Sequence, residues 1–556
     1  MSTHINETKE EQKNLLIAMM LIVAVLFGFD FIFPSDNQNK VAVPIQPTVA
    51  QMSAESVPAV DMIVPSGQKA PINTPTELSV ENDFVLGAIG TNGGNINALE
   101  LTAYKQTTKP NSPNVSLLKP NEYWTALQWV GRDVQMPSAD DVWLVQGDKV
   151  TPFSSVKLTY QNQDIKIERT LSVDEAYMFT VSDTVTNLMQ KPISVALNGG
   201  VYRRMNTDTL STSVVHEGFL SLIDGKLVEK DYSDVEDDNF SDKTTGGWMG
   251  ITDKYWQSVM IFDQNAKDVD VSFTRQGDLY SASFQTAGET IPAGGTLTRS
   301  THIFAGAKKL DLINAYEKEL NIPKFDLSID FGWFYFLTRP FLAFLNWLYA
   351  MVGNMGVAIL IFATLIRIAL LPIATKSYES MAKMRKVQPK MKLLQERYKN
   401  DRMRLQQEMM NLYKREKINP AGGCLPMLLQ IPVFYALYKV LSVSINMRQA
   451  PFFGWIHDLS MPDPSSVLTA FGYLDWPIPS FLNIGIWPVL MGLTMYIQQK
   501  LNPAPTDKTQ ANVFKWMPII FTFMLGSFAS GLVIYWTWSN VLSIAQQKYI
   551  MKKVGV

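Results

Sequence analysis

The sequence contains a single cysteine, Cys424, and only four histidines among its 556 residues. One cysteine excludes any intrachain disulfide, so an exported domain in this chain must be stable without one. The sequence also has no G-x-x-x-x-G-K-S/T phosphate loop and no metal-ligand spacing of His and Cys. We therefore expect no cofactor and no metal, and we expect a protein that is not an enzyme.

Charged residues are scarce, at 18% of the chain, whereas apolar residues make up 47%. Residues 35–330 carry 24 Lys and Arg against 38 Asp and Glu, while the rest of the chain carries 25 against 13. Opposite charge balances indicate that the two regions face different compartments. Together with the length, this composition indicates a membrane protein with a large water-exposed part.

The first long apolar run covers residues 15–33 and follows Lys13. Its length is sufficient to span a bilayer. A cleaved signal peptide is the alternative, but the run is long for that purpose and no clear A-x-A cleavage site follows it. We interpret residues 1–33 as an uncleaved transmembrane anchor and residues 34–76, which contain seven prolines, as an extended linker.

Residues 77–325 have the alternating pattern of β-strands. VKLTY at 156–160 and IKIERTL at 165–171 alternate apolar and polar residues and are joined by the short polar turn QNQD. Similar segments recur up to residue 304, and a helix is predicted at 308–320. The pattern predicts a large β-sandwich. Its histidines, His216 and His302, are interpreted as structural residues.

Two neighbouring segments establish the expected topology. Residues 326–353 are rich in aromatic side chains and contain Arg339 and Pro340, which favours a helix lying at the membrane surface. Residues 374–420 carry 13 Lys and Arg against 5 Asp and Glu, so this loop is expected in the cytoplasm. Only one span, residues 354–373, then separates the loop from the exported domain.

Arg367 lies inside that span, about nine residues before Lys376 and therefore roughly 13 Å within the membrane boundary. An arginine near a helix centre costs about 2.5–3.5 kcal/mol on insertion scales. No Asp or Glu occurs in the later apolar runs to neutralise it. Two interpretations remain open: Arg367 extends to the cytoplasmic headgroups, or it places a positive charge in a wet cavity open to the cytoplasm.

The loop 374–420 is predicted to form a helical hairpin that turns near residues 400–401, with Pro389 kinking its first helix. Both helices have narrow, methionine-rich apolar faces. The hairpin is either a solvated connector or a docking surface for an anionic partner, such as ribosomal RNA or lipid headgroups. The face residues are Met381, Met384, Met391, Leu394, Tyr398, Leu405, Met409, Leu412 and Tyr413.

Residues 421–556 contain four further apolar runs, at 423–443, 482–499, 516–528 and 531–547. Lys439, near the outer end of the first run, is expected to extend toward the headgroups. The run at 516–528 covers only about 20 Å, which predicts local thinning of the bilayer. With the anchor, the chain then has six spans and both termini in the cytoplasm.

Several strings between residues 366 and 547 occur together and in order: IRIALLP, SYESMAKMRKVQPK, QEMMNLYKREKINPAGGCLPMLLQIPVFYALY, RQAPFFGWIHDLS and SGLVIYWTWSN followed by IAQQ. In these strings the sequence resembles the YidC/Oxa1/Alb3 membrane protein insertases, and its long exported domain resembles that of the Gram-negative members. The resemblance covers residues 357–549. The exported domain is matched only by position, size and β pattern.

The resemblance implies an α-helical polytopic membrane protein whose five core helices surround a hydrophilic groove, together with a periplasmic β-supersandwich like that of sugar mutarotases but without their activity. Arg367 stands at the position of the family's groove arginine. A threonine found four residues before this arginine in a relative is Ala363 here, with Thr364 beside it. The remaining substrate contacts that the resemblance implies are Tyr535, Trp536, Met491 and Met495.

The implied function is to insert, fold and help assemble integral proteins of the bacterial inner membrane, alone or with the Sec translocon and its accessory subunits. Nascent membrane proteins, the ribosome and membrane lipids are the implied partners, and DNA is not. A secondary transporter or channel that uses the same arginine is the alternative, although no inverted repeat supports it. A membrane-anchored carbohydrate enzyme would need acids and histidines lining one pocket.

Overall fold

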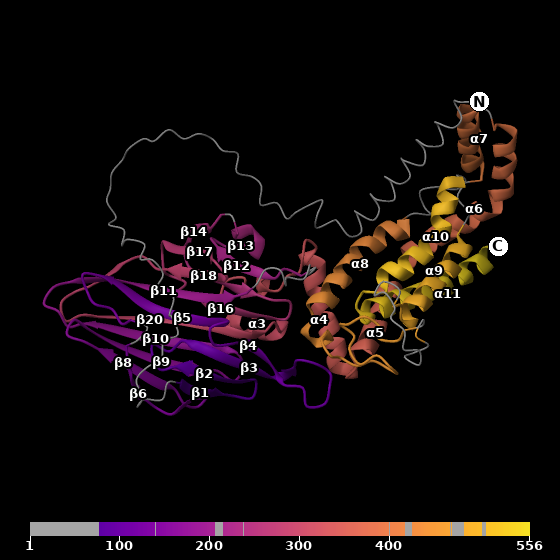
Figure 1. The fold of residues 1–556 in the computed structure, drawn as a ribbon. Coiled ribbons are helices and arrows are strands. Elements are labelled where there is room, and N and C mark those ends of the chain that lie inside the picture. The colour runs from indigo at the N-terminus through magenta and orange to yellow at the C-terminus, as the bar shows by residue number, and fades with distance from the viewer. Residues whose placement is uncertain are drawn as a thin grey trace, which may run out of the picture.

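The computed structural model describes residues 77–138, 141–205, 215–236, 238–399, 401–416, 425–466, 469, 483–502 and 508–555. These residues form a β-domain followed by a helical region (Figure 1). The predicted anchor 1–33 and linker 34–76 lie outside the described residues, as do the turn at residue 400 and most of the segment 467–482.

The β-domain contains three sheets. The first has the order β4-β3-β2-β1-β7, with β1 (Glu77–Glu81), β2 (Val85–Gly90), β3 (Ile96–Lys105), β4 (Asn114–Leu118) and β7 (Lys149–Val150). The second has the order β13-β12-β15-β16-β20-β10-β9-β8-β6, with β6 (Leu144–Gln146), β8 (Val156–Gln161), β9 (Ile165–Val173), β10 (Met178–Asn187), β12 (Gly218–Ile223), β13 (Lys226–Asp231), β15 (Trp248–Thr252), β16 (Trp256–Ile261) and β20 (Thr296–Ala307). The third has the order β14-β17-β18-β11-β19, and β5 pairs with β11; its strands are β5 (Tyr123–Arg132), β11 (Ile193–Arg204), β14 (Phe240–Thr244), β17 (Val269–Gln276), β18 (Leu279–Gln285) and β19 (Glu289–Ile291).

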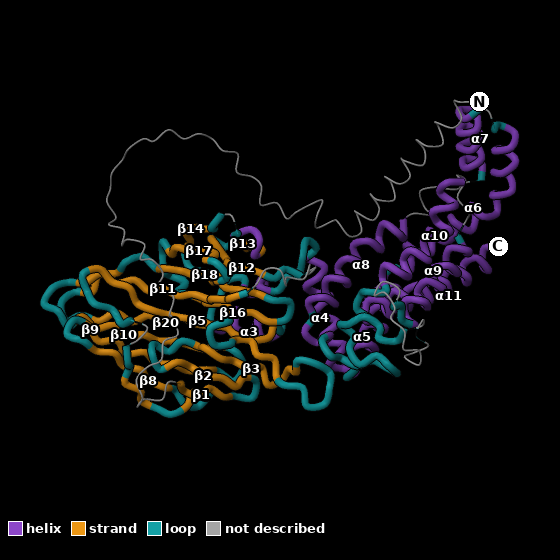
Figure 2. Tube along the Cα trace, in the orientation of Figure 1, coloured by secondary structure: helices purple, strands orange, loops and turns teal. Residues whose placement is uncertain are grey.

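The period-2 pattern explains how these sheets share one core. In β8 and β9 buried and partly exposed residues alternate, and the two strands pair antiparallel with Val156 opposite Leu171. Their apolar side chains therefore point to one face, where they join Val80 of the first sheet and Val201 of the third. The predicted β-sandwich is confirmed, and so is its 156–171 hairpin (Figure 2).

The helical region starts where the β-domain ends. Its helices are α3 (Leu310–Glu319), α4 (Tyr335–Val352), α5 (Met355–Ala369), α6 (Leu371–Arg397), α7 (Arg402–Arg415), α8 (Leu425–Val443), α9 (Ile486–Leu501), α10 (Lys508–Leu525) and α11 (Ser530–Val554). The last helix, α11, contacts α5, α6, α8 and α9, α4 packs on α5 and α8, and α10 packs on α9. The helices that carry most of the candidate site residues, α5, α9 and α11, therefore meet at α11 (Figure 1).

In the part of the chain that the structure describes, no single helix is both long and apolar enough to cross a bilayer. The pair α5 and α6 satisfies the length and composition together, but the two helices are bent by 68° at the break between them. The bend lies at Leu370, just before Pro372, whereas α6 continues as one helix through Pro389. A proline at the second position of a helix is well tolerated, so a new helix begins there.

The helix α10 differs from the prediction for 516–528. It begins at Lys508, eight residues before the predicted run, and its 18 residues extend about 27 Å. The polar residues at its start belong to the helix because propensity, not hydropathy, determines where a helix begins. These polar residues lengthen the helix without lengthening its apolar run, so the local thinning of the bilayer stays a prediction.

The β-domain and the helical region meet at a junction to which Asp330, between α3 and α4, and Arg448 contribute. Asp330 accepts from the backbone N–H of His216 in the β-domain at 2.9 Å. Lys439 Nζ lies 2.7 Å from Asp330 Oδ2, and the two side chains are 5% and 15% exposed. Arg448 Nη2 donates to the Lys105 carbonyl at 2.6 Å, and its guanidinium lies over the Trp256 ring. The prediction that Lys439 extends to the headgroups is wrong, because a buried carboxylate binds its ammonium group.

Candidate functional site

The candidate site lies where α5 meets α11. The side chain of Asn354 caps α5 by accepting from Val357 N at 3.0 Å, which fixes the start of the helix. Arg367 falls in its last turn and is half-buried. The length of α5 thus places a guanidinium beside the middle of α11.

Arg367 is held by uncharged oxygen atoms. Its Nη2 donates to the Ser539 carbonyl at 3.0 Å and to Ser539 Oγ at 3.2 Å, and it also contacts Ser543 Oγ. Ser539 and Ser543 are four residues apart and therefore lie one above the other on the same face of α11. The contact fixes the guanidinium without a carboxylate, so its positive charge is not neutralised by these partners.

Thr364 strengthens the same helix contact. It lies three residues before Arg367, and its Oγ1 accepts from Trp538 Nε1 at 3.0 Å while donating to the Leu360 carbonyl at 2.8 Å. The hydroxyl is therefore engaged within the protein. Ala363 is 5% exposed and packs into the main core.

Tyr535 lies one turn before Ser539 on α11. Its ring is buried, and its hydroxyl accepts from Gln430 Nε2 of α8 at 3.0 Å. Tyr535, Ser539 and Ser543 therefore form a polar stripe on one face of α11, and side chains of α8 and α5 bind to it.

The other three predicted site residues gather elsewhere. Met491 and Met495 of α9 and Trp536 of α11 pack in a separate apolar cluster with Leu525 and Val533. The Trp536 ring centroid also lies 4.5 Å from that of Phe434 and 5.7 Å from that of Phe521. The structure thus brings Arg367, Thr364 and Tyr535 to one face of α11 and the remaining three to another.

Four residues of this site were not predicted: Gln430, Trp538, Ser539 and Ser543. The signal for the two serines was available, because Tyr535, Ser539 and Ser543 follow a four-residue spacing. No comparable signal identified Gln430 or Trp538.

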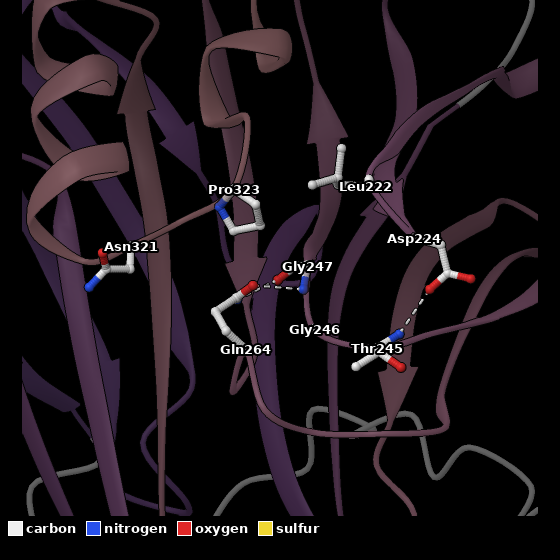
Figure 3. Close-up of a pocket in the computed structure, with 9 residues that line it drawn as sticks. Leu222, Asp224, Thr245, Gly246, Gly247, Gln264, Asn321 and Pro323 are labelled. Carbon is white, nitrogen blue, oxygen red and sulfur yellow. Dashed lines mark hydrogen bonds between the residues drawn. The ribbon is translucent and has the colours of Figure 1, made fainter.

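A cavity of about 340 Å³ lies in the β-domain, at the β12–β13 turn (Figure 3). The amide of Gln264 accepts from Gly247 N at 2.9 Å and donates back to the Gly247 carbonyl at 3.0 Å, and Asp224 accepts from Thr245 N. These polar groups are bound to one another, and no histidine lines the cavity. Among the described residues, no group of three or more His, Cys, Asp or Glu could hold a metal ion.

Comparison with known proteins adds to this geometry. A family model described as "60Kd inner membrane protein" matches residues 347–555, and one described as "YidC periplasmic domain" matches residues 77–344. The chain is 41% identical over 575 residues to "Membrane protein insertase YidC" of Rhizobium meliloti (strain 1021), which covers 98% of this chain and 96% of the relative. It is 46% identical over 491 residues to the protein of the same name from Agrobacterium fabrum, covering 86% and 82%.

A solved structure described as "Active YidC insertase crystal structure with the first transmembrane domain resolved" is 17% identical, with a TM-score of 0.35, and covers 85% of this chain and 92% of that one. The assignment rests on the sequence matches, which define an inner-membrane protein with a β-sandwich periplasmic domain and a helical C-terminal region. The chain belongs to the YidC/Oxa1/Alb3 family and is a membrane protein insertase. This is not an enzyme family, and the matches give no support to a transporter or channel.

Proposed function

We propose that this insertase moves the polar segment of a nascent membrane protein along the α5–α11 face and that Arg367 attracts acidic residues of that segment. The observation that carries the proposal is the set of partners of Arg367, which are two serine hydroxyls and one carbonyl. In the described part of the chain no carboxylate pairs with it. A full positive charge is therefore available to a substrate in a region of low dielectric constant.

The proposed surface is a hydrophilic groove open to the cytoplasm and to lipid. Tyr535 contacts the substrate beside Arg367, and Trp536, Met491 and Met495 contact it from the adjoining apolar cluster. Thr364 holds α5 against α11, and Ala363 is buried next to it. The apolar segment of the substrate then moves into the bilayer along α11. Its burial supplies the driving force at about 25 cal/mol for each Å² removed from water, so no nucleotide is needed.

The proposed topology has six spans, with both termini and the loops 374–420 and 500–515 in the cytoplasm and the β-domain in the periplasm. The charge balance of the loops supports it. Single cysteines in a Cys424→Ser background test it. Leu393 of α6 is 67% exposed, so Leu393→Cys offers an accessible thiol. Labelling of that cysteine from the periplasmic side would overturn the topology.

The basic hairpin formed by α6 and α7 is the proposed contact for the ribosome or for lipid headgroups. In this scheme nascent chains arrive there directly or from the Sec translocon and its accessory subunits, and the protein also helps them fold and assemble. The hairpin's own apolar contact is small, formed by Val387, Met391 and Leu412 with a few partly buried neighbours. A small contact leaves most of its basic surface open to a partner.

The experiment compares two small substrates that differ only in tail charge, one acidic and one neutral, in proteoliposomes. Arg367→Lys keeps most activity, because diverse tails respond to the charge rather than to a fixed guanidinium geometry. Arg367→Ala and Arg367→Glu lose insertion of the acidic tail, and the neutral tail suffers less. Equal loss for both tails would assign Arg367 to packing or hydration.

Two serine variants separate the charge from the helix contact. Ser543→Ala removes one hydrogen-bond partner of Arg367 but leaves its charge, so the preference for the acidic tail persists. Ser543→Asp places a carboxylate beside the guanidinium, so that preference is lost while α5 and α11 stay bound. Retention of the preference in Ser543→Asp would refute the electrostatic part of the proposal.

A further inference from the structure

The polar stripe on α11 continues one step beyond Ser543, to Gln546. At 100° per residue, Gln546 projects between Tyr535 and Ser539, on the face that receives Arg367. The next residue on this face, Ile550, packs against Ala374 and Tyr378 of α6. Gln546 therefore lies between two contacts made by the neighbouring helices, on the cytoplasmic side of Arg367 in the proposed topology.

Gln546 differs from the rest of the stripe in its hydrogen bonding. Tyr535, Ser539 and Ser543 each have a partner from α8 or α5. Both amide atoms of Gln546, Nε2 and Oε1, are buried and have no hydrogen-bond partner among the described residues. Such a group is costly in a protein interior, and an apolar side chain of the same shape would avoid the cost.

We propose that Gln546 binds the peptide backbone of the passing substrate segment. A carboxamide offers one acceptor and two donor hydrogens, which match the N–H and C=O of a peptide unit. Such a contact is independent of the substrate's side chains, as a protein that handles many substrates requires. The inference rests on the proposed function and extends it, because Arg367 then selects for charge while Gln546 binds any polypeptide.

Access to Gln546 requires α6 to move from α11, since both amide atoms are shielded from solvent in this state. Part of the contact that must open is apolar, formed among the described residues by Ala374, Tyr378 and Ile550 with Met381 packed on them. The Arg385 guanidinium, which contacts Met551 Sδ at 4.0 Å, belongs to the same interface, so the opening is a sub-global motion of α6. The substrate segment then replaces the surface that α6 covers.

The adjacent glutamine provides a matched control. Gln547 Nε2 donates to Asn502 Oδ1 at 3.0 Å, so its donor group already has an internal role, and only its Oε1 is buried without a partner among the described residues. We expect Gln546→Met to unfold at the parental temperature or higher, because it removes two unpaired polar atoms. Gln547→Met, by contrast, removes one unpaired atom but also loses a hydrogen bond, so it unfolds at a lower temperature than Gln546→Met.

The functional test uses two neutral tails, one rich in Ala and Ser and one rich in Pro, which lacks most backbone N–H groups. Gln546→Met slows insertion of the Ala/Ser tail by about threefold to tenfold, as expected for one or two lost hydrogen bonds, and changes the Pro tail little. Gln547→Met affects both tails alike. Parental rates for both tails in Gln546→Met, or an equal loss for both, would overturn the inference.

A photo-crosslinking residue tests the contact directly. Placed at 546 it labels the substrate, whereas at Val541, which is 39% exposed and projects about 140° away on α11, it does not. Equal labelling at the two positions would exclude a specific contact. If the parental protein inserts neither substrate, the proposed function fails; if it inserts both and Gln546→Met does too, only this inference fails.

Discussion

The stability of the junction depends on the buried ion pair between Asp330 and Lys439. Asp330 accepts from Lys439 Nζ at 2.7 Å, from the backbone N–H of His216 at 2.9 Å and, through Oδ1, from Gly332 N at 3.1 Å. Burial alone would raise the pKa of Asp330, but the charge and hydrogen bond of Lys439 outweigh it and lower that pKa. We therefore treat Asp330 as ionised and Lys439 as its main partner.

The expected magnitudes follow from this geometry. At 2.7 Å and an effective dielectric constant of about 20, the Coulomb attraction is about 6 kcal/mol, most of which is offset by desolvation of the two groups. Lys439→Met leaves a buried carboxylate without its cation, and Asp330→Asn leaves a buried ammonium. Each single change should weaken the junction by about 3–5 kcal/mol. The double variant removes both charges and should be more stable than either single variant.

Hydrogen exchange of the His216 amide measures the stability of the junction, because that N–H donates to Asp330 and becomes exchangeable when the junction opens. Removal of the exposed pair Lys119 and Glu122, whose side chains are 52% and 66% exposed, is the control and should leave the exchange rate unchanged. A double variant that loses as much protection as the two single variants combined would show that Lys439 and Asp330 are not coupled.

Two further predictions use other features of the chain. Deletion of residues 380–415 should leave the protein in the membrane but impair insertion, measured in proteoliposomes; unchanged insertion would make the hairpin a connector only. The second concerns pH: burial opposes the charging of His216, but its hydrogen bond to Asp231, the charge of Glu229 and the Phe219 carbonyl together raise its pKa. Its stabilising contribution is therefore complete below about pH 6.5 and lost as the pH rises through the raised pKa, so the unfolding midpoint should fall as the pH increases above about 6.5. A His216→Gln variant with the same pH dependence would contradict this assignment.

The sequence was most informative where one side-chain period dominated. Alternation over 156–171 predicted two strands joined by a turn, and the structure pairs them as β8 and β9, because a one-residue slip would turn the buried face outward. Helix ends were harder to predict from the sequence. The start of α10 at Lys508 and the bend after Ala369 depend on propensity and proline position, which an apolar-run analysis does not measure.

Only part of the candidate site was predicted, because its contacts join residues that lie far apart in the sequence. Arg367 could be selected because a charge in an apolar run is costly wherever the helix lies. Its partners Ser539 and Ser543 are 172 and 176 residues away along the chain. Lys439 was misassigned because its partner, Asp330, belongs to a segment 109 residues earlier, and only the folded chain places the two together.

The contrast between Arg367 and Lys439 shows how one chain treats two cations in its apolar helices differently. Lys439 has a buried carboxylate 2.7 Å away, so its charge is neutralised locally, and that carboxylate in turn accepts from the His216 N–H of the β-domain. Arg367 is bound by hydroxyl and carbonyl oxygens, which orient a guanidinium without cancelling its field. Only an un-neutralised charge can attract a mobile anionic segment over several ångströms. The choice of partner therefore separates the structural cation from the one to which we assign substrate attraction.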